Sequence, residues 1–168
     1  LDWNFVLKNK DTFEFFKSQD KTARIANFPQ HTFWGWNFYS WGYGGSGFLW
    51  YGIERPILDR AFDVWSQTNE QYYFELSNAI YSKNADEVAR VLDKYQVSFL
   101  LVDKNITYPP SPKSLFYPEL DQLIAKLPRV SKVKTFGNIA IYKVDLKDQP
   151  NNHIYTAKGL SSVSKSKL

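Results

Sequence analysis

The fold is decided by NADEVARVLDKYQVSFLLV (residues 84–102), an amphipathic segment followed at once by an uninterrupted apolar one. Asn84 and Glu87 have the spacing of a helix cap pair, and the apolar residues after them recur at helical intervals. Residues 97–102 are short and continuously apolar, which is typical of a strand buried on both faces of a sheet. A helix that leads directly into such a strand predicts an α/β fold.

The segments before this unit predict a further strand and two further helices. Residues 23–28 alternate in polarity and stop at Pro29, as a strand entering a sheet does. A short helix is expected to begin at Asp11, because Glu14 follows at capping-box spacing. Apolar residues recur at helical spacing over residues 68–82.

The segments after it predict one more helix and a hairpin. Helical spacing returns over residues 120–127 and ends at Pro128. Residues 130–136 and 139–145 then flank Gly137-Asn138, a two-residue loop suited to a type II′ or type I′ turn. We therefore expect an α/β fold with a mixed, mostly parallel sheet flanked by helices and ending in a β-hairpin.

The composition predicts one domain. The 168 residues are 43% hydrophobic, enough to bury a real core, and no run approaches the ~20 apolar residues that span a bilayer. The chain opens on a leucine and contains no methionine, so we expect it to be part of a longer polypeptide. We predict a membrane-proximal remnant at residues 1–10, a single soluble α/β domain at residues 11–146, and a polar, basic tail or linker at residues 147–168.

Cysteine is absent and only two histidines are present, which removes thiolate chemistry and makes a zinc site improbable. We predict no metal site and no cofactor in this domain. The formal net charge of +4 arises partly from lysines in the tail, so the body is close to neutral and nucleic acid is not an expected partner.

Residues 30–53 differ from the rest of the chain because they carry no charge and hold six of the eight glycines. Large rings on a glycine-rich backbone suit a surface that binds a sugar or a lipid-linked sugar. The alternative is that the rings pack against a transmembrane part of the same protein or against the domain core, and both interpretations stay open. The aromatic residues concerned are Trp34, Trp36, Tyr39, Trp41, Tyr43, Trp50 and Tyr51.

The order of three short segments resembles a known family. SWGYGG at residues 40–45, RPILD at residues 55–59 and KYQVSFLLV at residues 94–102 are arranged as in the extracytoplasmic domain of oligosaccharyltransferase catalytic subunits and related GT-C-type membrane glycosyltransferases. The resemblance extends to bacterial polytopic membrane proteins of related architecture and covers about residues 23–102. Trp41, Tyr43 and Gly44 match the family's Trp-Trp-Asp-Tyr-Gly motif, whereas Gly42 stands in place of its aspartate.

The resemblance implies a site and its partners. We predict substrate-binding roles for Trp36, Trp41, Tyr43, Gly44, Arg55 and Asp59, and assign no catalytic residue. The charged residues after the loop also fit a structural salt-bridge network that orients it, and this is the favoured interpretation of Glu54, Arg55, Asp59, Arg60 and Asp63. Gly42 supplies no carboxylate for a hydrogen bond to an acceptor hydroxyl group.

We therefore expect the soluble extracytoplasmic domain of a polytopic membrane glycosyltransferase that uses a lipid-linked sugar donor. The aromatic glycine-rich loop would help to shape the donor or acceptor site, and any divalent metal would belong to the membrane part. Expected partners are the transmembrane part of the same polypeptide, a lipid-linked sugar or glycan acceptor, and the membrane surface at the extracytoplasmic face of the cell membrane. The alternative is a noncatalytic cell-envelope glycan-binding or assembly module.

Overall fold

The computed structural model describes residues 3–30, 36–45, 48–59, 66–108 and 117–147. Trp34, Arg60, Asp63 and nearly all of the tail predicted at residues 147–168 lie outside these residues.

The apolar run of the deciding segment forms β5 (Val97–Asp103), the middle strand of a five-stranded sheet of order β4-β1-β5-β8-β7. β1 (Arg24–Phe28) pairs in parallel with β4 (Ile57–Leu58) and with β5. β8 (Ile139–Val144) is antiparallel to both β5 and β7 (Val130–Phe136), so four of the five described strands run in one direction. The prediction of a mixed, mostly parallel sheet that ends in a hairpin is confirmed.

The turn of that hairpin is now defined. Phe136 pairs with Ile139, which leaves Gly137-Asn138 as the two-residue loop. Gly137 has a φ of 57°, whereas Asn138 is not among the described residues with positive φ. A positive φ at the first loop residue alone selects type II′ from the two predicted turn types.

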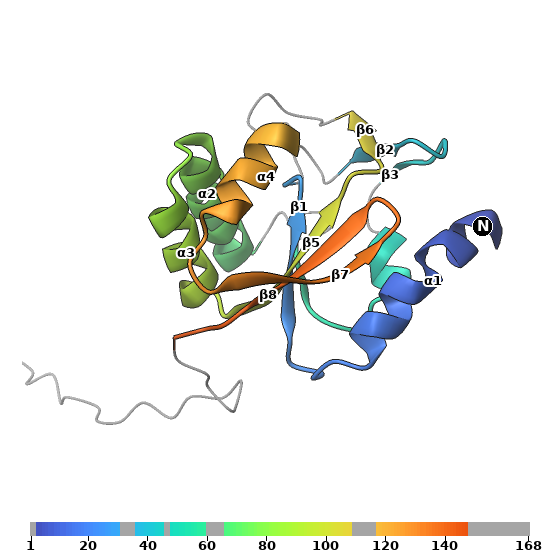
Figure 1. Ribbon diagram of the computed structural model, residues 1–168, viewed down its shortest axis with the longest axis horizontal. Coiled ribbons are helices and arrows are strands. Elements are labelled where there is room, and N and C mark those ends of the chain that lie inside the picture. Colours follow the sequence, from blue (N-terminus) through green and yellow to red (C-terminus); the bar gives the residue numbers. More distant parts are fainter. Residues whose placement is uncertain (1–2, 31–35, 46–47, 60–65, 109–116, 148–168) are drawn as a thin grey trace, which may run out of the picture.

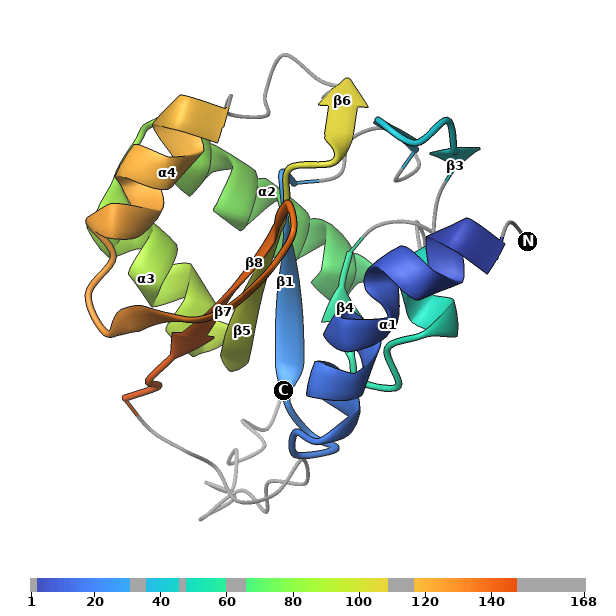
Figure 2. The same ribbon diagram turned by 45° about the vertical axis from the view of Figure 1, so that its right-hand side comes forward.

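Helices cover both faces of this sheet (Figure 1, and from a second direction Figure 2). α2 (Gln67–Tyr81), α3 (Ala85–Lys94) and α4 (Tyr117–Ala125) lie on one face. α1 (Trp3–Lys17) and the 3₁₀ helix η2 (Phe48–Tyr51) lie on the other. Alternate residues of β5 serve the two layers: Leu100 packs in the core of the first face and Leu101 in that of the second.

The helix ends follow their caps, with one exception. Ser66 and Asn84 accept hydrogen bonds from the third residues of α2 and α3, as expected of N-caps. α1, however, begins at Trp3 instead of at Asp11, and runs without a break across residue 10. The capping-box signal is overridden because Asn9 and Phe16 lie seven positions apart on one buried face, so packing against the sheet extends the helix upstream.

A second, three-stranded sheet lies beyond the carboxyl ends of β1 and β5 (Figure 1). Its order is β3-β2-β6, formed by Gly44–Gly45, Asn37–Tyr39 and Ile106–Tyr108, and both pairings are antiparallel. The segment predicted as an aromatic loop is therefore partly a β-hairpin. None of the helices in the described part of the chain has the length and hydropathy that crossing a membrane requires.

Candidate functional site

The β2–β3 hairpin explains why glycine stands at position 42. The Gly42 N–H donates to the Tyr39 carbonyl at 3.0 Å, and the Tyr39 N–H donates to the Tyr43 carbonyl at 2.9 Å. These bonds close a tight turn in which Gly42 has a φ of 92°, a conformation that side-chain-bearing residues rarely adopt. The position that carries aspartate in the resembling family is here a turn residue whose φ favours glycine.

The chain alternates between buried and exposed side chains through β2. Asn37 and Tyr39 are buried, whereas Trp36 and Phe38 are 49% and 45% exposed. A Cβ atom placed on Gly44 would lie 3.3 Å from the Phe38 ring and 3.7 Å from the Trp36 indole nitrogen, so both rings lie close over this glycine. Gly44 thus lets two aromatic side chains lie against the backbone and remain open to solvent.

Tyr39, Trp41 and Tyr43 form a ring cluster on the same hairpin. The Trp41 and Tyr43 rings are stacked with centroids 5.3 Å apart, and the Trp41 ring lies 5.1 Å from that of Tyr39. Trp41 and Tyr43 are half-buried and pack against the core of the α1 face. Trp41 and Tyr43 therefore pack against the domain core, as the alternative interpretation of the aromatic segment expected. The rings of this hairpin that face outward are those of Trp36 and Phe38.

A second pair of exposed rings belongs to η2, where Trp50 is 38% and Tyr51 is 85% exposed. The Trp50 indole N–H donates to Asp59 Oδ2 at 3.0 Å. Asp59 follows β4 directly, and it also contributes to the electrostatic environment of Tyr39. Asp59 therefore ties η2 to the carboxyl end of β4.

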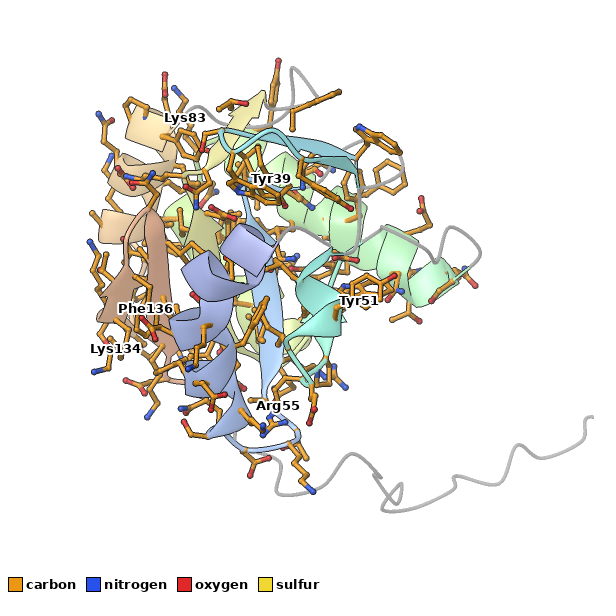
Figure 3. The ribbon with its side chains drawn as sticks, turned by 90° about the vertical axis from the view of Figure 1, so that its right-hand side faces the viewer. Tyr39, Tyr51, Arg55, Lys83, Lys134 and Phe136 are labelled. Carbon is orange, nitrogen blue, oxygen red and sulfur yellow. The ribbon has the colours of Figure 1, made fainter. Side chains whose placement is uncertain are left out.

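Arg55 lies elsewhere. Its guanidinium donates to the carbonyl oxygens of Lys17 (2.7 Å), the last residue of α1, and of Gln19 (2.8 and 3.1 Å), and also to that of Glu54. It is buried, and it forms no ion pair with Glu54 or Asp59 within the described residues. Figure 3 shows Arg55 near one end of the molecule and Tyr39 near the other. The structure does not bring Arg55 to the aromatic residues.

Three turns meet beside the hairpin. Asp103, at the end of β5, accepts hydrogen bonds from the Asn105 backbone and side chain at 2.9 and 2.8 Å. The Asn105 carbonyl in turn accepts the Ser40 N–H at 2.7 Å, and Asn138 of the β7–β8 turn donates to the Asn105 side chain. The Tyr117 hydroxyl donates to the carbonyls of Asp103 and Ile106. Asn105 thus ties the hairpin to the central strand.

Asp103 is the polar residue that the sequence prediction missed. It is 3% exposed, and burial raises the pKa of its carboxyl from 3.8 to about 6, although the hydrogen bonds from Asn105 lower it. Burial, followed by the charge of Asp103, raises the pKa of the nearby Tyr39 hydroxyl. The sequence did hold a signal for this residue, because Asp103 comes directly after the apolar run. It therefore lies at the carboxyl edge of the sheet, where α/β proteins bind their ligands.

Within the described residues, no three side chains of the metal-binding types come together. The polar groups near the hairpin are carboxylates, amides and phenols, which suit hydrogen bonding to a neutral, hydroxylated ligand.

No protein-family model matches this sequence, and no curated protein matches it either. Solved structures do match. A cryo-EM structure of a mutant form of arabinofuranosyltransferase AftD from Mycobacteria aligns with a TM-score of 0.67 at 17% identity over 80% of this chain. A second AftD structure aligns with a TM-score of 0.60 at 17% identity over 83% of this chain. This chain has a fold that also occurs in a glycosyltransferase.

The resemblance stated from the sequence is confirmed at the level of the fold. This chain covers 12% of the length of AftD in both comparisons, so it corresponds to a small part of that protein. The C-terminal globular domain of the oligosaccharyltransferase from Archaeoglobus fulgidus also aligns, with a TM-score of 0.48 at 13% identity, over 83% of this chain and 97% of that one.

Proposed function

We propose that this chain is the extracytoplasmic domain of a polytopic membrane glycosyltransferase that uses a lipid-linked sugar donor. In this proposal the aromatic hairpin helps to shape the donor or acceptor site. The observation that carries it is the pair of outward rings, Trp36 and Phe38, held over Gly44 at the carboxyl edge of the sheet.

The chemistry of these residues suits a glycan. Aromatic rings offer flat apolar surfaces to the C–H faces of sugar rings, and nearby polar groups fix the orientation of the ligand. Asp59, held by Trp50, is a polar group of this kind beside the aromatic surface. The fold shared with AftD, by name an arabinofuranosyltransferase, supports a transferase of this class.

The domain would act by positioning. It would orient the sugar and exclude water, while the transmembrane part of the same polypeptide carries out the transfer and holds any divalent metal. The exposed tryptophans also suit contact with the membrane surface at the extracytoplasmic face.

One observation favours a second candidate, a noncatalytic cell-envelope glycan-binding or assembly module. Gly42 has a φ that favours glycine, and this hairpin does not present the carboxylate found there in the resembling enzymes. A module that only binds a glycan has no need of that carboxylate.

The binding role is tested by titrating the chain with a polyprenyl-phosphate-linked sugar while tryptophan fluorescence is recorded. The same lipid without its sugar is the matched ligand. We expect a saturable response to the sugar-bearing lipid that Trp36→Ala weakens and Tyr81→Ala does not, because Tyr81 is 66% exposed on α2, in the layer on the other face of the sheet. Trp36 is preferred to Trp41 for this test because Trp41 packs into the ring cluster. Equal responses to both lipids would contradict sugar binding.

The enzyme is distinguished from the module by the size of the natural polypeptide. Antibodies raised against this chain should detect a membrane-fraction protein much larger than the 19.6 kDa of the chain itself. A 19.6 kDa species in the water-soluble fraction would contradict the transferase proposal.

A further inference from the structure

The α1 face of the five-stranded sheet changes character along its strands. Near the amino ends this face is apolar, with Ile25 of β1 and Phe99 of β5 packed against Phe16 of α1. Toward the carboxyl ends the same face carries buried polar side chains instead. They come from three elements, α1, β1 and β5, and include Asn9, Thr12, Asn27 and Asp103.

The opposite face of the sheet does not change in this way. At the same level it carries Phe28 and Val102, both buried in the core beneath α2, α3 and α4. Polar residues are therefore not a general feature of these strand ends. Within β1 and β5, the buried polar side chains Asn27 and Asp103 lie on the face that the aromatic hairpin covers.

Asn27 is the residue that points to a ligand. It is 5% exposed, and neither its Oδ1 nor its Nδ2 has a hydrogen-bond partner in the described part of the protein. The hydroxyl oxygen of Thr12, fully buried on the facing helix, has none there either. Buried amides are almost always paired, because an unpaired one loses its hydration without compensation. The fold keeps Asn27 at a cost in stability.

Asp103 lies beside Asn27 on the same face. Asn27 pairs with Leu101, so Asp103 is two positions further along β5. From the strand spacing and the rise per residue, their Cα atoms lie about 8 Å apart. Asp103 Oδ1 is already held by Asn105, which fixes the carboxylate in place. At that separation, a hydroxyl group placed between the two side chains could reach both.

We propose that Asn27, Thr12 and Asp103 bind a hydroxyl group of a sugar unit whose ring lies among the aromatic side chains of the β2–β3 hairpin. This inference rests on the proposed function and names the subsite within it. A hydroxyl group can donate its one hydrogen to the carboxylate and accept from the Asn27 amide N–H, so it would pair the Nδ2 of Asn27. An anion would be repelled by Asp103, and a metal ion would leave the Asn27 amide nitrogen unpaired.

Tyr39 connects this polar subsite to the rings of Trp41 and Tyr43. Its side chain is buried in the apolar core that also contains Ile25 and Leu101, and its ring contacts Trp41 and Tyr43. The charge of Asp103 acts on its hydroxyl. The subsite is covered in this structure, as suits a place that receives one hydroxyl group while the sugar ring stays in the aromatic layer.

The test is a titration of the ¹⁵N-labelled chain with three methyl glycosides, of β-D-glucopyranose, α-D-mannopyranose and α-D-arabinofuranose, followed by NMR. We expect at least one glycoside to shift the side-chain amide signals of Asn27. Asn27→Leu is close to isosteric and removes both polar atoms, so it should weaken that binding by about tenfold or more without lowering Tm. Thr12→Val is a second isosteric variant with the same expected direction. Asn78→Leu, on an exposed position of α2, is the matched control and should bind as the unsubstituted chain does.

The outcomes separate the subsite from the function. If Trp36→Ala weakens binding but Asn27→Leu and Thr12→Val do not, the subsite is refuted and the aromatic surface stands. If Asn27→Leu lowers Tm and leaves the affinity unchanged, a structural water occupies the place and the subsite is again refuted. If no glycoside and no lipid-linked sugar binds the unsubstituted chain, the proposed function fails with it.

Discussion

At the scale of single residues, the carboxylate charge of Asp103 is not required for the hydrogen bonds of the turn that follows β5. Both hydrogen bonds from Asn105 go to Oδ1, and a neutral amide oxygen could accept them equally well. Burial raises the pKa of this carboxyl in the folded chain from 3.8 to about 6. The folded state therefore binds the proton more tightly than the unfolded state, and stability falls as the pH rises from about 4 to about 6.

Asp103→Asn should remove this dependence. A shift of about two pH units corresponds to about 3 kcal/mol, so the variant should be more stable than the unsubstituted chain by up to that amount at pH 7.5, and by little at pH 3.5. Urea denaturation at the two pH values measures the difference. Asp86→Asn, on the exposed start of α3, serves as the control. Equal gains at both pH values would show that the charge is not the cause.

Arg55 illustrates the opposite case, a charged residue that stabilises the fold. Arg55→Met keeps much of the side-chain volume but leaves the carbonyls of Lys17 and Gln19 without their donor. We expect a loss of about 3 kcal/mol in the free energy of unfolding, measured by urea denaturation. Sugar binding by the folded fraction should stay unchanged, because Arg55 lies far from the hairpin.

The control for Arg55 is Arg90→Met. Arg90 is exposed on α3 and pairs with Glu87, and exposed pairs of this kind contribute little to stability. A loss of sugar binding in Arg55→Met at unchanged stability would instead support the substrate-binding role predicted from the sequence.

At the scale of elements, the sequence predicted what local patterns encode. α3 and β5 have a cap pair, helical spacing and a continuous apolar run, and the structure contains both. The β2–β3 hairpin has no such pattern, because its residues are aromatic on both sides of the strand. β2 also pairs with β6, which lies about 70 residues further along the chain, and no local sequence pattern predicts that pairing.

Tyr117 should control the order of the hairpin from a distance. Its hydroxyl donates to the Asp103 carbonyl at 3.0 Å and to the Ile106 carbonyl at 2.6 Å, and so fixes the turn that receives the Ser40 N–H. Tyr117→Phe should lower the free energy of unfolding by about 1–2 kcal/mol. It should also speed hydrogen exchange of the Ser40 amide, measured by NMR.

Tyr142→Phe is the control for Tyr117→Phe, because it removes a hydroxyl that makes no hydrogen bond within the described residues. The Tyr142 ring itself lies near Lys132. If both variants changed Ser40 exchange alike, the bridge from α4 would not be the cause.

At the scale of the whole molecule, the candidate site could be predicted only in part. Trp36, Gly44 and Asp59, predicted from the sequence as substrate-binding residues, lie at the carboxyl side of the sheet, and their roles stay predictions. Arg55 and Asp59 are four residues apart in the sequence, but β4 runs between them and sends them to opposite edges. Asn27 could not be selected in advance, because only the assembled layers reveal that its amide is unpaired.

The two layers predict different consequences for two neighbouring leucines of β5. Leu100 and Leu101 are both fully buried, one under α2 to α4 and one under α1 and the hairpin. Replacing either with alanine should cost about 2–5 kcal/mol in a denaturation experiment. Only Leu101→Ala should change the native tryptophan fluorescence, because Trp41 packs against the core that contains Leu101. The same spectral change in Leu100→Ala would contradict this separation.

The alternation along β2 has a practical consequence for redesign. The side chains of Asn37 and Tyr39 are buried and hold the hairpin against the core, whereas those of Trp36 and Phe38 are exposed. A combinatorial library randomised at Trp36 and Phe38 would therefore sample new ligand preferences on an unchanged scaffold. The hairpin thus keeps the side chains that hold it in the fold apart from those that can be exchanged for a new ligand.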